Sequence, residues 1–251
     1  MEMADFMFPI EERTMDLMPL PAQLVLGQRV DSDLDHKVLL RPDTGEIIAI
    51  VPKSYYLITN EDIIAQFYAE LRDRQIPAFI DDTNSFADNH RMTVQTTLPE
   101  INFPIADSQL GLCLFVSNTY VDGSGIRIVF GAVQFKFGYT MYLSRTLDEK
   151  SIPHQKKVNL SREVKNAVSY ALENWPAVEE KIHKLEKTPL ALDFYEQIEG
   201  IFGQTWEARI REKKPATMWQ AHSMLSSFVS VEFKKEERGR LHSIVSPLFD
   251  L

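Results

Sequence analysis

Two neighbouring β-type segments constrain the fold of this chain more than any other feature of its sequence. Residues 110–120 are almost entirely apolar, and in residues 125–142 apolar side chains occupy both alternating sets of positions. A strand with apolar residues on both faces is typical of the interior of a sheet, where both faces are covered. The turn sequence Asp122-Gly123-Ser124-Gly125 separates the two segments. We therefore predict an antiparallel sheet with a helix on at least one face.

A second pair of β-type runs, residues 37–41 and 46–51, is joined by Pro42-Asp43-Thr44-Gly45. This junction predicts a hairpin, because proline fixes φ and glycine adopts positive φ without strain. Residues 90–98 carry alternating polar side chains and indicate an exposed strand.

Helical patterns follow the hairpin and fill the end of the chain. Apolar residues recur at helical spacing after residue 60 and throughout residues 161–245. The boundaries are indicated by capping residues and prolines. We predict a helix capped by Thr59 or Asn60 and ended by Pro77, one capped by Ser161 and kinked or broken at Pro176, one opened by Thr188-Pro189, one beginning near Thr217, and a final one that carries Leu241, Ile244 and Val245 and is followed by Pro247.

These patterns predict an α+β fold. An antiparallel sheet with a packed helix forms the N-terminal half, and the C-terminal third is helical. By residue number, we expect an N-terminal arm over 1–35, a strand-rich α+β core over 36–150, and a helical region over 151–251 that packs on the core.

Composition narrows the class of protein. The 251 residues contain one cysteine, Cys113, which rules out an internal disulfide framework and is typical of a reducing compartment. The apolar runs are much shorter than the roughly 20 residues that span a membrane. The formal net charge of −9 argues against a protein that binds nucleic acid over its whole surface, but it permits a local basic groove. We expect a cytoplasmic protein with no membrane partner.

No catalytic motif is recognisable. Asp43-Thr44-Gly45 matches the short aspartic-protease signature, but the predicted hairpin explains it better. No two of the six histidines stand at metal-binding spacing, and the chain has no glycine-rich phosphate loop. We expect no catalytic residue, metal or cofactor, and so no enzyme, although a hydrolase built from distant residues would leave no such signal.

Basic and aromatic residues gather around the second long strand and after it. Single-stranded nucleic acid is held by a basic track with aromatic faces on which bases stack. The same pattern is typical of core aromatics beside a solvated helix start, so both interpretations stay open. The candidate nucleic-acid-binding residues are Arg127, Lys136, Phe137, Tyr139, Lys156, Lys157, Arg162 and Lys165.

Three blocks carry a family resemblance: residues 39–60, with Leu39-Leu40-Arg41 and Tyr55-Tyr56; residues 116–124, with Ser117-Asn118 and Asp122-Gly123-Ser124; and residues 218–228, with Met218-Trp219-Gln220-Ala221. They resemble a prokaryotic phage/plasmid-like family catalogued as domain-of-unknown-function family 932. Members carry Cys-x-Asn after the central strand, where this chain reads Phe135-Lys136-Phe137-Gly138. The resemblance implies a mobile-element context and brings no established chemistry.

Two hypotheses follow. The first is a non-enzymatic phage or plasmid protein of nucleic-acid metabolism that binds or anneals single-stranded DNA in recombination, as a homo-oligomer. This rests on an analogy of fold and context with phage annealing proteins. The alternative is an acidic inhibitor or adaptor that binds a host protein, because a surface of net charge −9 can dock on a basic partner.

Overall fold

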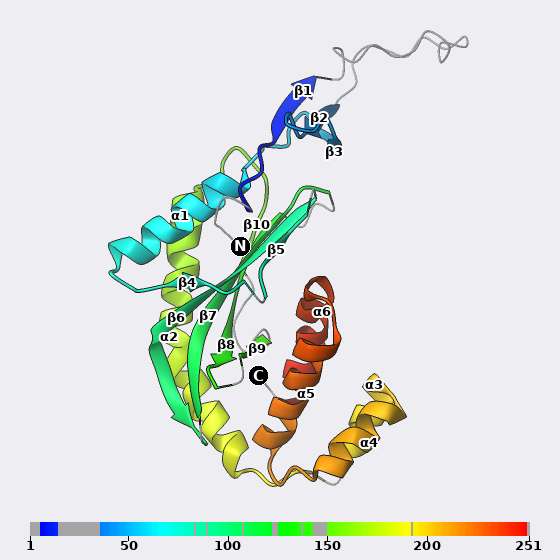
Figure 1. Cartoon of the computed structure of the whole chain (residues 1–251). Coiled ribbons are helices and arrows are strands. Elements are labelled where there is room, and N and C mark those ends of the chain that lie inside the picture. The colour runs from blue at the N-terminus through cyan, green and yellow to red at the C-terminus, as the bar shows by residue number, and fades with distance from the viewer. Residues whose placement is uncertain are drawn as a thin grey trace, which may run out of the picture.

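The structure, a computed structural model, describes residues 6–14, 36–82, 84–88, 90–106, 108–121, 125–136, 138–142, 150–191 and 193–249 (Figure 1). It has two antiparallel sheets with helices packed on them, so the predicted α+β class is confirmed. The strands are β1 (Glu11–Thr14), β2 (His36–Leu40), β3 (Ile47–Pro52), β4 (Phe79–Ile80), β5 (Phe86–Ala87), β6 (Arg91–Ile105), β7 (Ser108–Thr119), β8 (Ile126–Gln134), β9 (Tyr139–Tyr142) and β10 (Lys150–Ile152). The helices are α1 (Asn60–Asp73), α2 (Leu160–Lys187), α3 (Phe194–Phe202), α4 (Gln204–Lys213), α5 (Met218–Glu232), α6 (Lys235–Val245) and the 3₁₀ helix η4 (Ser246–Phe249).

The small sheet has the strand order β1-β2-β3. It contains the predicted hairpin: β2 and β3 pair antiparallel across a turn in which Gly45 adopts φ +73°. Part of the predicted N-terminal arm belongs to this sheet, because β1 pairs with β2. Residues 1–5 and 15–35 of that arm lie outside the described residues.

The large sheet has the order β10-β8-β7-β6-β4, with β5 on β6 and β9 on β8. Alternate residues of its long strands point to one face, where Leu114 and Ile128 join a buried cluster with Val168 and Trp175 of α2. In Figure 1, α1 and α2 lie together along this face. Burial of both strand and helix apolar residues here supplies the main core of the protein.

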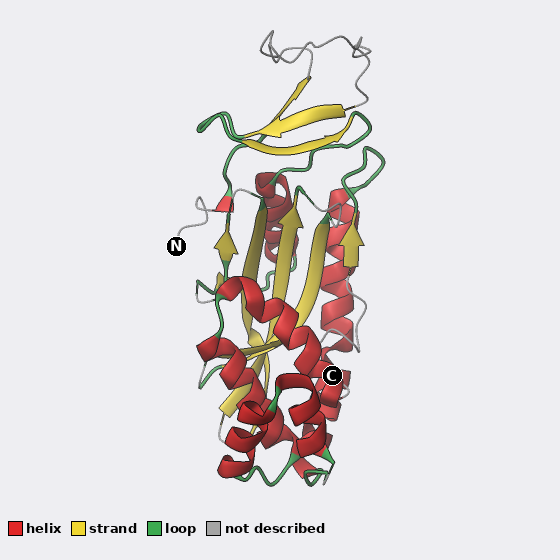
Figure 2. Ribbon diagram, turned by 90° about the vertical axis from the view of Figure 1, so that its right-hand side faces the viewer, coloured by secondary structure: helices red, strands yellow, loops and turns green. Residues whose placement is uncertain are grey.

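The opposite face of the large sheet is covered at one end only. Helices α5 and α6 contact β9, and Cys113, Phe115 and Val133 form a buried apolar cluster at that end. Figure 2 shows the helices of the C-terminal third in front of the lower part of the sheet, while the upper part is uncovered on that side. The sheet therefore has one face that is fully covered and one that is half covered.

Two predicted helix starts are confirmed in detail. Thr59 caps α1 through a reciprocal pair of hydrogen bonds: its side chain accepts from the Asp62 backbone N–H, and the Asp62 carboxylate accepts from the Thr59 backbone N–H, each at 3.1 Å. Thr217 caps α5 by accepting from the Gln220 backbone N–H. Both caps satisfy backbone donors that have no partner within the helix.

Of the two alternatives predicted at Pro176, a kink or a break, the break is wrong. α2 begins after Asn159, which caps it in place of Ser161, and the helix continues through Pro176 to Lys187. Burial of Val178 and Ile182 beyond the proline outweighs the lost backbone hydrogen bond. Despite its length α2 is rich in charge, and no helix among the described residues is long and apolar enough to cross a membrane.

The helix predicted to open at Thr188-Pro189 begins later. Thr188 ends α2, and Pro189 forms an isolated antiparallel bridge with Thr217. The backbone N–H of Met218 donates to the Thr188 carbonyl at 2.9 Å, which ties the two ends together. Helix α3 then starts at Phe194.

The two strand predictions also need correction. Beyond the exposed His90 and Arg91, this segment is not an exposed strand: β6 pairs with β7 on one side and with β4 and β5 on the other, and Gln95, Thr96 and Thr97 are buried. Gln95 and Thr96 form side-chain hydrogen bonds, with Asp81 and Tyr68 respectively, each at 3.0 Å, whereas the Thr97 hydroxyl has no partner among the described residues. Residues 125–142 form a hairpin of β8 and β9 rather than one strand, with Gly138 at φ +67° in the turn.

Substitution of Gly131 by alanine tests the packing of the large sheet, and the same substitution at Gly200 is its control. A Cβ on Gly131 would lie 2.3 Å from the Met141 carbonyl oxygen, whereas one on Gly200 in α3 would have no atom within 4 Å. We expect Gly131→Ala to destabilise the protein by about 1–3 kcal/mol through overpacking against β9. Gly200→Ala should stabilise it by up to about 1 kcal/mol. Urea unfolding of both variants measures this, and equal stabilities would contradict the β8–β9 contact.

Candidate functional site

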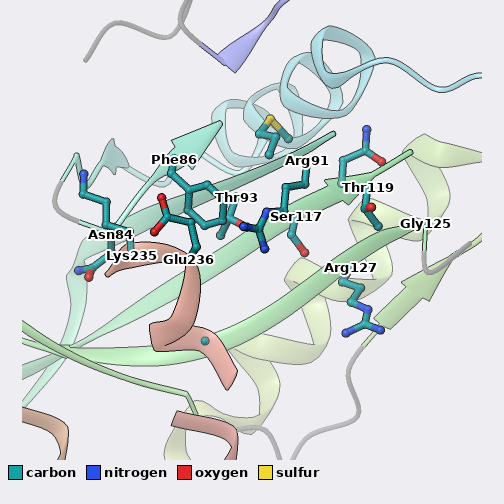
Figure 3. A pocket seen from close by; sticks show the side chains of 13 residues that line it. Asn84, Phe86, Arg91, Thr93, Ser117, Thr119, Gly125, Arg127, Lys235 and Glu236 are labelled. Carbon is teal, nitrogen blue, oxygen red and sulfur yellow. The ribbon is translucent and has the colours of Figure 1, made fainter. Parts of the chain in front are cut away.

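A polar pocket lies where the large sheet is uncovered. Its volume is about 230 Å³. The sheet contributes Phe86, Arg91, Thr93, Ser117, Thr119 and Arg127, and the start of α6 contributes Lys235 and Glu236 (Figure 3). Arginine, lysine and hydroxyl side chains on one concave surface form a site for an anionic, hydrogen-bonding ligand.

The floor of the pocket is a single row of side chains across four strands. In the sheet register Phe86 pairs with Thr93, Thr93 with Ser117, and Ser117 with Arg127. Directly paired residues project from the same face, and their Cα atoms are about 4.5–5.5 Å apart. The row therefore runs about 15 Å from an aromatic ring, past two hydroxyl groups, to a guanidinium group.

The next row of the same face has a different character. It contains Gln95, Phe115 and Val129, and Phe115 and Val129 belong to the apolar cluster at the end covered by α5 and α6. Two residues further along β7 and β8, the side chains on this face are therefore apolar instead of polar. The pocket lies at the boundary where α6 begins.

Arg91 is held in a fixed position beside the aromatic ring. Its guanidinium carbon lies 5.1 Å from the centre of the Phe86 ring, and its Nε donates to the Asp88 carboxylate at 3.0 Å. Burial raises the pKa of Asp88, but hydrogen bonds from the His90 and Arg91 backbone and the Arg91 side chain outweigh it and lower that pKa below its ordinary value. Asp88 thus stays ionised and orients Arg91, whose Nη groups retain further donors.

The start of α6 fixes the loop that carries Phe86. Lys235 Nζ donates to the backbone carbonyls of Asp82 and Ser85, the latter at 3.3 Å, and Arg238 donates to the Asn84 side chain at 2.9 Å. Carbonyl acceptors hold the Lys235 ammonium without neutralising its charge. The loop and the cation at the pocket wall are therefore positioned together.

A buried polar network lies behind the pocket and joins it to α1 and to the segment before α2. Asn118 donates to the Asn60 side chain at 2.8 Å, Tyr120 donates to the same oxygen at 2.9 Å, and Asn60 donates to the Phe6 carbonyl at 3.0 Å. His154 completes it, with Nε2 2.9 Å from the Asn118 side-chain oxygen. Segments far apart in the sequence meet here through fully paired polar groups.

The network defines the tautomer of His154. The Ile58 backbone N–H donates to Nδ1 at 3.3 Å, so Nδ1 carries no hydrogen, and Nε2 must be the atom that donates to Asn118. Protonation would place a second donor against the Ile58 N–H. Burial lowers the pKa of His154 to about 4.

Two more histidines are buried between α5, α6 and η4. Burial lowers the pKa of His222 and of His242 to about 3, and for His242 the neighbouring His222 and Arg238 contribute. His222 lies between Trp219 and Phe249, and neither of its ring nitrogens forms a hydrogen bond with a described residue. Both rings are therefore neutral in the folded protein at neutral pH.

The structure places two of the predicted binding residues at opposite ends of one strand. Arg127, near the start of β8, lines the pocket. Lys136 is exposed in the turn after β8, nine residues further on and roughly 30 Å away at about 3.3 Å per residue. Phe137 lies outside the described residues, and of Tyr139 only the backbone is described.

The other predicted residues lie at the start of α2. Lys156 and Lys157 are exposed in the turn before the helix, and Arg162 and Lys165 are exposed on its first turns. None of these four residues lines the pocket together with Arg127. Their role in nucleic-acid binding stays a prediction.

Sequence reasoning did not select most of the pocket residues. Arg91 and Thr93 belong to the alternating polar positions of residues 90–98, which indicated only an exposed strand. Their neighbours Ser117 and Phe86 become visible only through the strand register. Lys235 stands in a run of charged residues typical of any solvated helix start.

Comparison of the chain with protein families, curated proteins and solved structures gives no match. Within the described parts of the chain, no group of three or more His, Cys, Asp or Glu side chains is arranged to hold a metal ion. Function must therefore be inferred from the pocket itself.

The three buried histidines predict loss of stability in acid. Their pKa values are lower in the folded protein than the ordinary value of 6.5, so the unfolded chain takes up protons first. Stability is complete above about pH 6.5 and falls as the pH drops towards 4. Each histidine contributes about 1.4 kcal/mol per pH unit to the slope of the free energy of unfolding against pH. The three together give a slope of about 4 kcal/mol per pH unit.

Urea unfolding between pH 7.5 and 4.5 measures this slope. His154→Gln should reduce it by about 1.4 kcal/mol per pH unit. The control His90→Gln changes an exposed ring and should leave the slope as it is. A slope that is the same in all three proteins would show that His154 is not a buried neutral base.

Proposed function

We propose that this protein binds single-stranded nucleic acid at the uncovered face of the large sheet and does so without catalysis. The observation that carries the proposal is the cross-strand row from Phe86 to Arg127. A base stacks on an aromatic face, and a backbone phosphate pairs with a guanidinium group. The row offers both, about 15 Å apart along the floor of one pocket.

The hydroxyl groups between them support the same function. Thr93, Ser117 and Thr119 are half-buried, and their side chains form no hydrogen bond with a described residue. Half-buried hydroxyls at the floor of a pocket are available to sugar and phosphate oxygens. A sheet that presents an aromatic ring flanked by basic and hydroxyl side chains is a common platform for single strands.

The biological setting of the proposal comes from the resemblance to the phage/plasmid-like family. We propose single-stranded DNA as the ligand, recombination or annealing as the process, a homo-oligomer as the working form, and the cytoplasm of a bacterial host as the location. Annealing needs a surface that holds a strand extended, and several copies side by side would join their pockets into a continuous path.

Binding of a single-stranded oligonucleotide tests the proposal. We expect fluorescence anisotropy to show binding at 50 mM salt that weakens at 200 mM. Arg127→Gln should weaken it and reduce the slope of log K against log salt by about 0.7, the contribution of one phosphate contact. Lys136→Gln removes the same charge outside the pocket and should have little effect. Absence of binding at 50 mM salt would reject the proposal and favour the acidic protein-binding alternative.

The stacking role of Phe86 needs a separate test. Removing one base–aromatic stack costs about 1–3 kcal/mol, so Phe86→Ala should raise Kd by about fivefold to a hundredfold. Phe79→Ala is the control, since Phe79 is 50% exposed on β4 and does not line the pocket. Thermal melting of both variants shows whether the fold is intact. Equal Kd values in folded variants would remove Phe86 from the site.

A further inference from the structure

Four polar side chains form a compact cluster within the pocket, here called the Arg91 cluster. The register of β6 and β7 pairs Arg91 with Thr119 and Thr93 with Ser117. Paired Cα atoms are about 5 Å apart, and residues two positions apart on one strand are about 7 Å apart. All four line the pocket and project from the same face of the sheet. One phosphate group over the centre of this rectangle is therefore within reach of all four side chains.

The Arg91 cluster offers hydrogen-bond donors rather than an excess of positive charge. Arg91 Nε donates to the Asp88 carboxylate at 3.0 Å, and this ion pair is neutral as a whole. The Nη groups of Arg91 and the three hydroxyl groups of the cluster form no hydrogen bond with a described residue. A site with many donors and little net charge suits a phosphodiester, which carries a single charge shared by two oxygen acceptors.

The aromatic ring of Phe86 lies directly beside the Arg91 cluster. The guanidinium carbon of Arg91 is 5.1 Å from the centre of this ring, and Phe86 pairs with Thr93 in the sheet. Figure 3 shows Phe86, Thr93 and Arg91 close together and Arg127 further away. Since about 15 Å separates Phe86 from Arg127 along the row, a nucleotide stacked on Phe86 reaches the Arg91 cluster with its own phosphate and does not reach Arg127.

We infer that the Arg91 cluster binds the phosphodiester group attached to the nucleotide whose base stacks on Phe86. The Nη groups of Arg91 donate to the two charged oxygens, and the hydroxyls of Thr93 and Ser117 donate to the same oxygens or to the adjoining sugar. This inference rests on the proposed function and deepens it: one nucleotide is recognised by its base and its phosphate together, and Arg127 contacts the strand at a different nucleotide.

Strands that carry a single base and a single uncharged linkage test the inference. All other positions are abasic, so only one nucleotide can stack on Phe86. A methylphosphonate replaces the phosphodiester on the 5′ side of the base, the one on its 3′ side, or one at the far end of the strand. Each strand competes at 50 mM salt with the labelled oligonucleotide. We expect one of the two adjacent substitutions to weaken competition about tenfold or more, the effect of a lost hydrogen bond to a charged group, and the distant one to have little effect.

The same strands assign the effect to particular side chains. In Arg91→Gln the adjacent methylphosphonate should weaken competition no further, because the contact that it removes is already lost, whereas in Lys136→Gln the effect should remain. Thr93→Val removes a hydroxyl at nearly unchanged volume and should raise Kd by about twofold to tenfold. Its matched control is Thr97→Val, because the Thr97 hydroxyl lies outside the pocket and forms no hydrogen bond with a described residue.

The outcomes separate this inference from general strand binding. Equal weakening by adjacent and distant methylphosphonates, an adjacent effect that persists in Arg91→Gln, or failure of every single-base strand to compete would overturn the inference and leave the proposed function in place. Equal Kd values for Thr93→Val and Thr97→Val would overturn the role of the hydroxyl. Failure of the labelled oligonucleotide to bind at 50 mM salt would overturn both the inference and the proposed function.

Discussion

The antiparallel register of β6, β7 and β8 is the constraint on which both the core and the pocket depend. It places Thr93 beside Ser117 and Ser117 beside Arg127 on the half-covered face. The same pairing places Val116 beside Ile128 on the face that packs against α2. Because side chains alternate strictly, a slip of one residue would exchange the two faces and expose the core. The buried apolar cluster therefore holds the register that assembles the polar row.

The buried network around Asn118 extends this constraint to the rest of the molecule. Asn118 belongs to β7, and through Asn60 and His154 it reaches the start of α1 and the segment that precedes α2. The roles of its groups are defined: the backbone N–H of Ile58 assigns the hydrogen on His154, and the Tyr120 hydroxyl accepts from the Asn60 backbone N–H and donates to the Asn60 side chain. Such networks tolerate little rearrangement, since a lost partner leaves a buried polar group unsatisfied. The end of the sheet that carries the pocket is thus joined by hydrogen bonds to α1 and to the segment before α2.

The sequence predicted the elements better than the site, and the difference has a physical reason. Local signals such as the cap at Thr59 and the turn at Gly45 act within a few residues, so the helix and hairpin were predictable. The break predicted at Pro176 is wrong, because burial of helix residues beyond the proline outweighs the loss of one backbone hydrogen bond. The pocket combines Phe86 with Arg127, which only pairing across four strands brings together. A single sequence shows alternation within a strand, but not which strand lies beside it.

The acidic character of the chain is consistent with a small anion site of this kind. At a net charge of −9 the long-range field repels a polyanion, so binding has to rely on contacts at short range. The cations of the pocket are accordingly positioned in advance: Phe86 and Asp88 orient Arg91, and backbone carbonyls hold Lys235. Such positioning lowers the entropy lost on binding, which compensates for a small number of charges. A ligand with its charge concentrated at one point gains most from this arrangement.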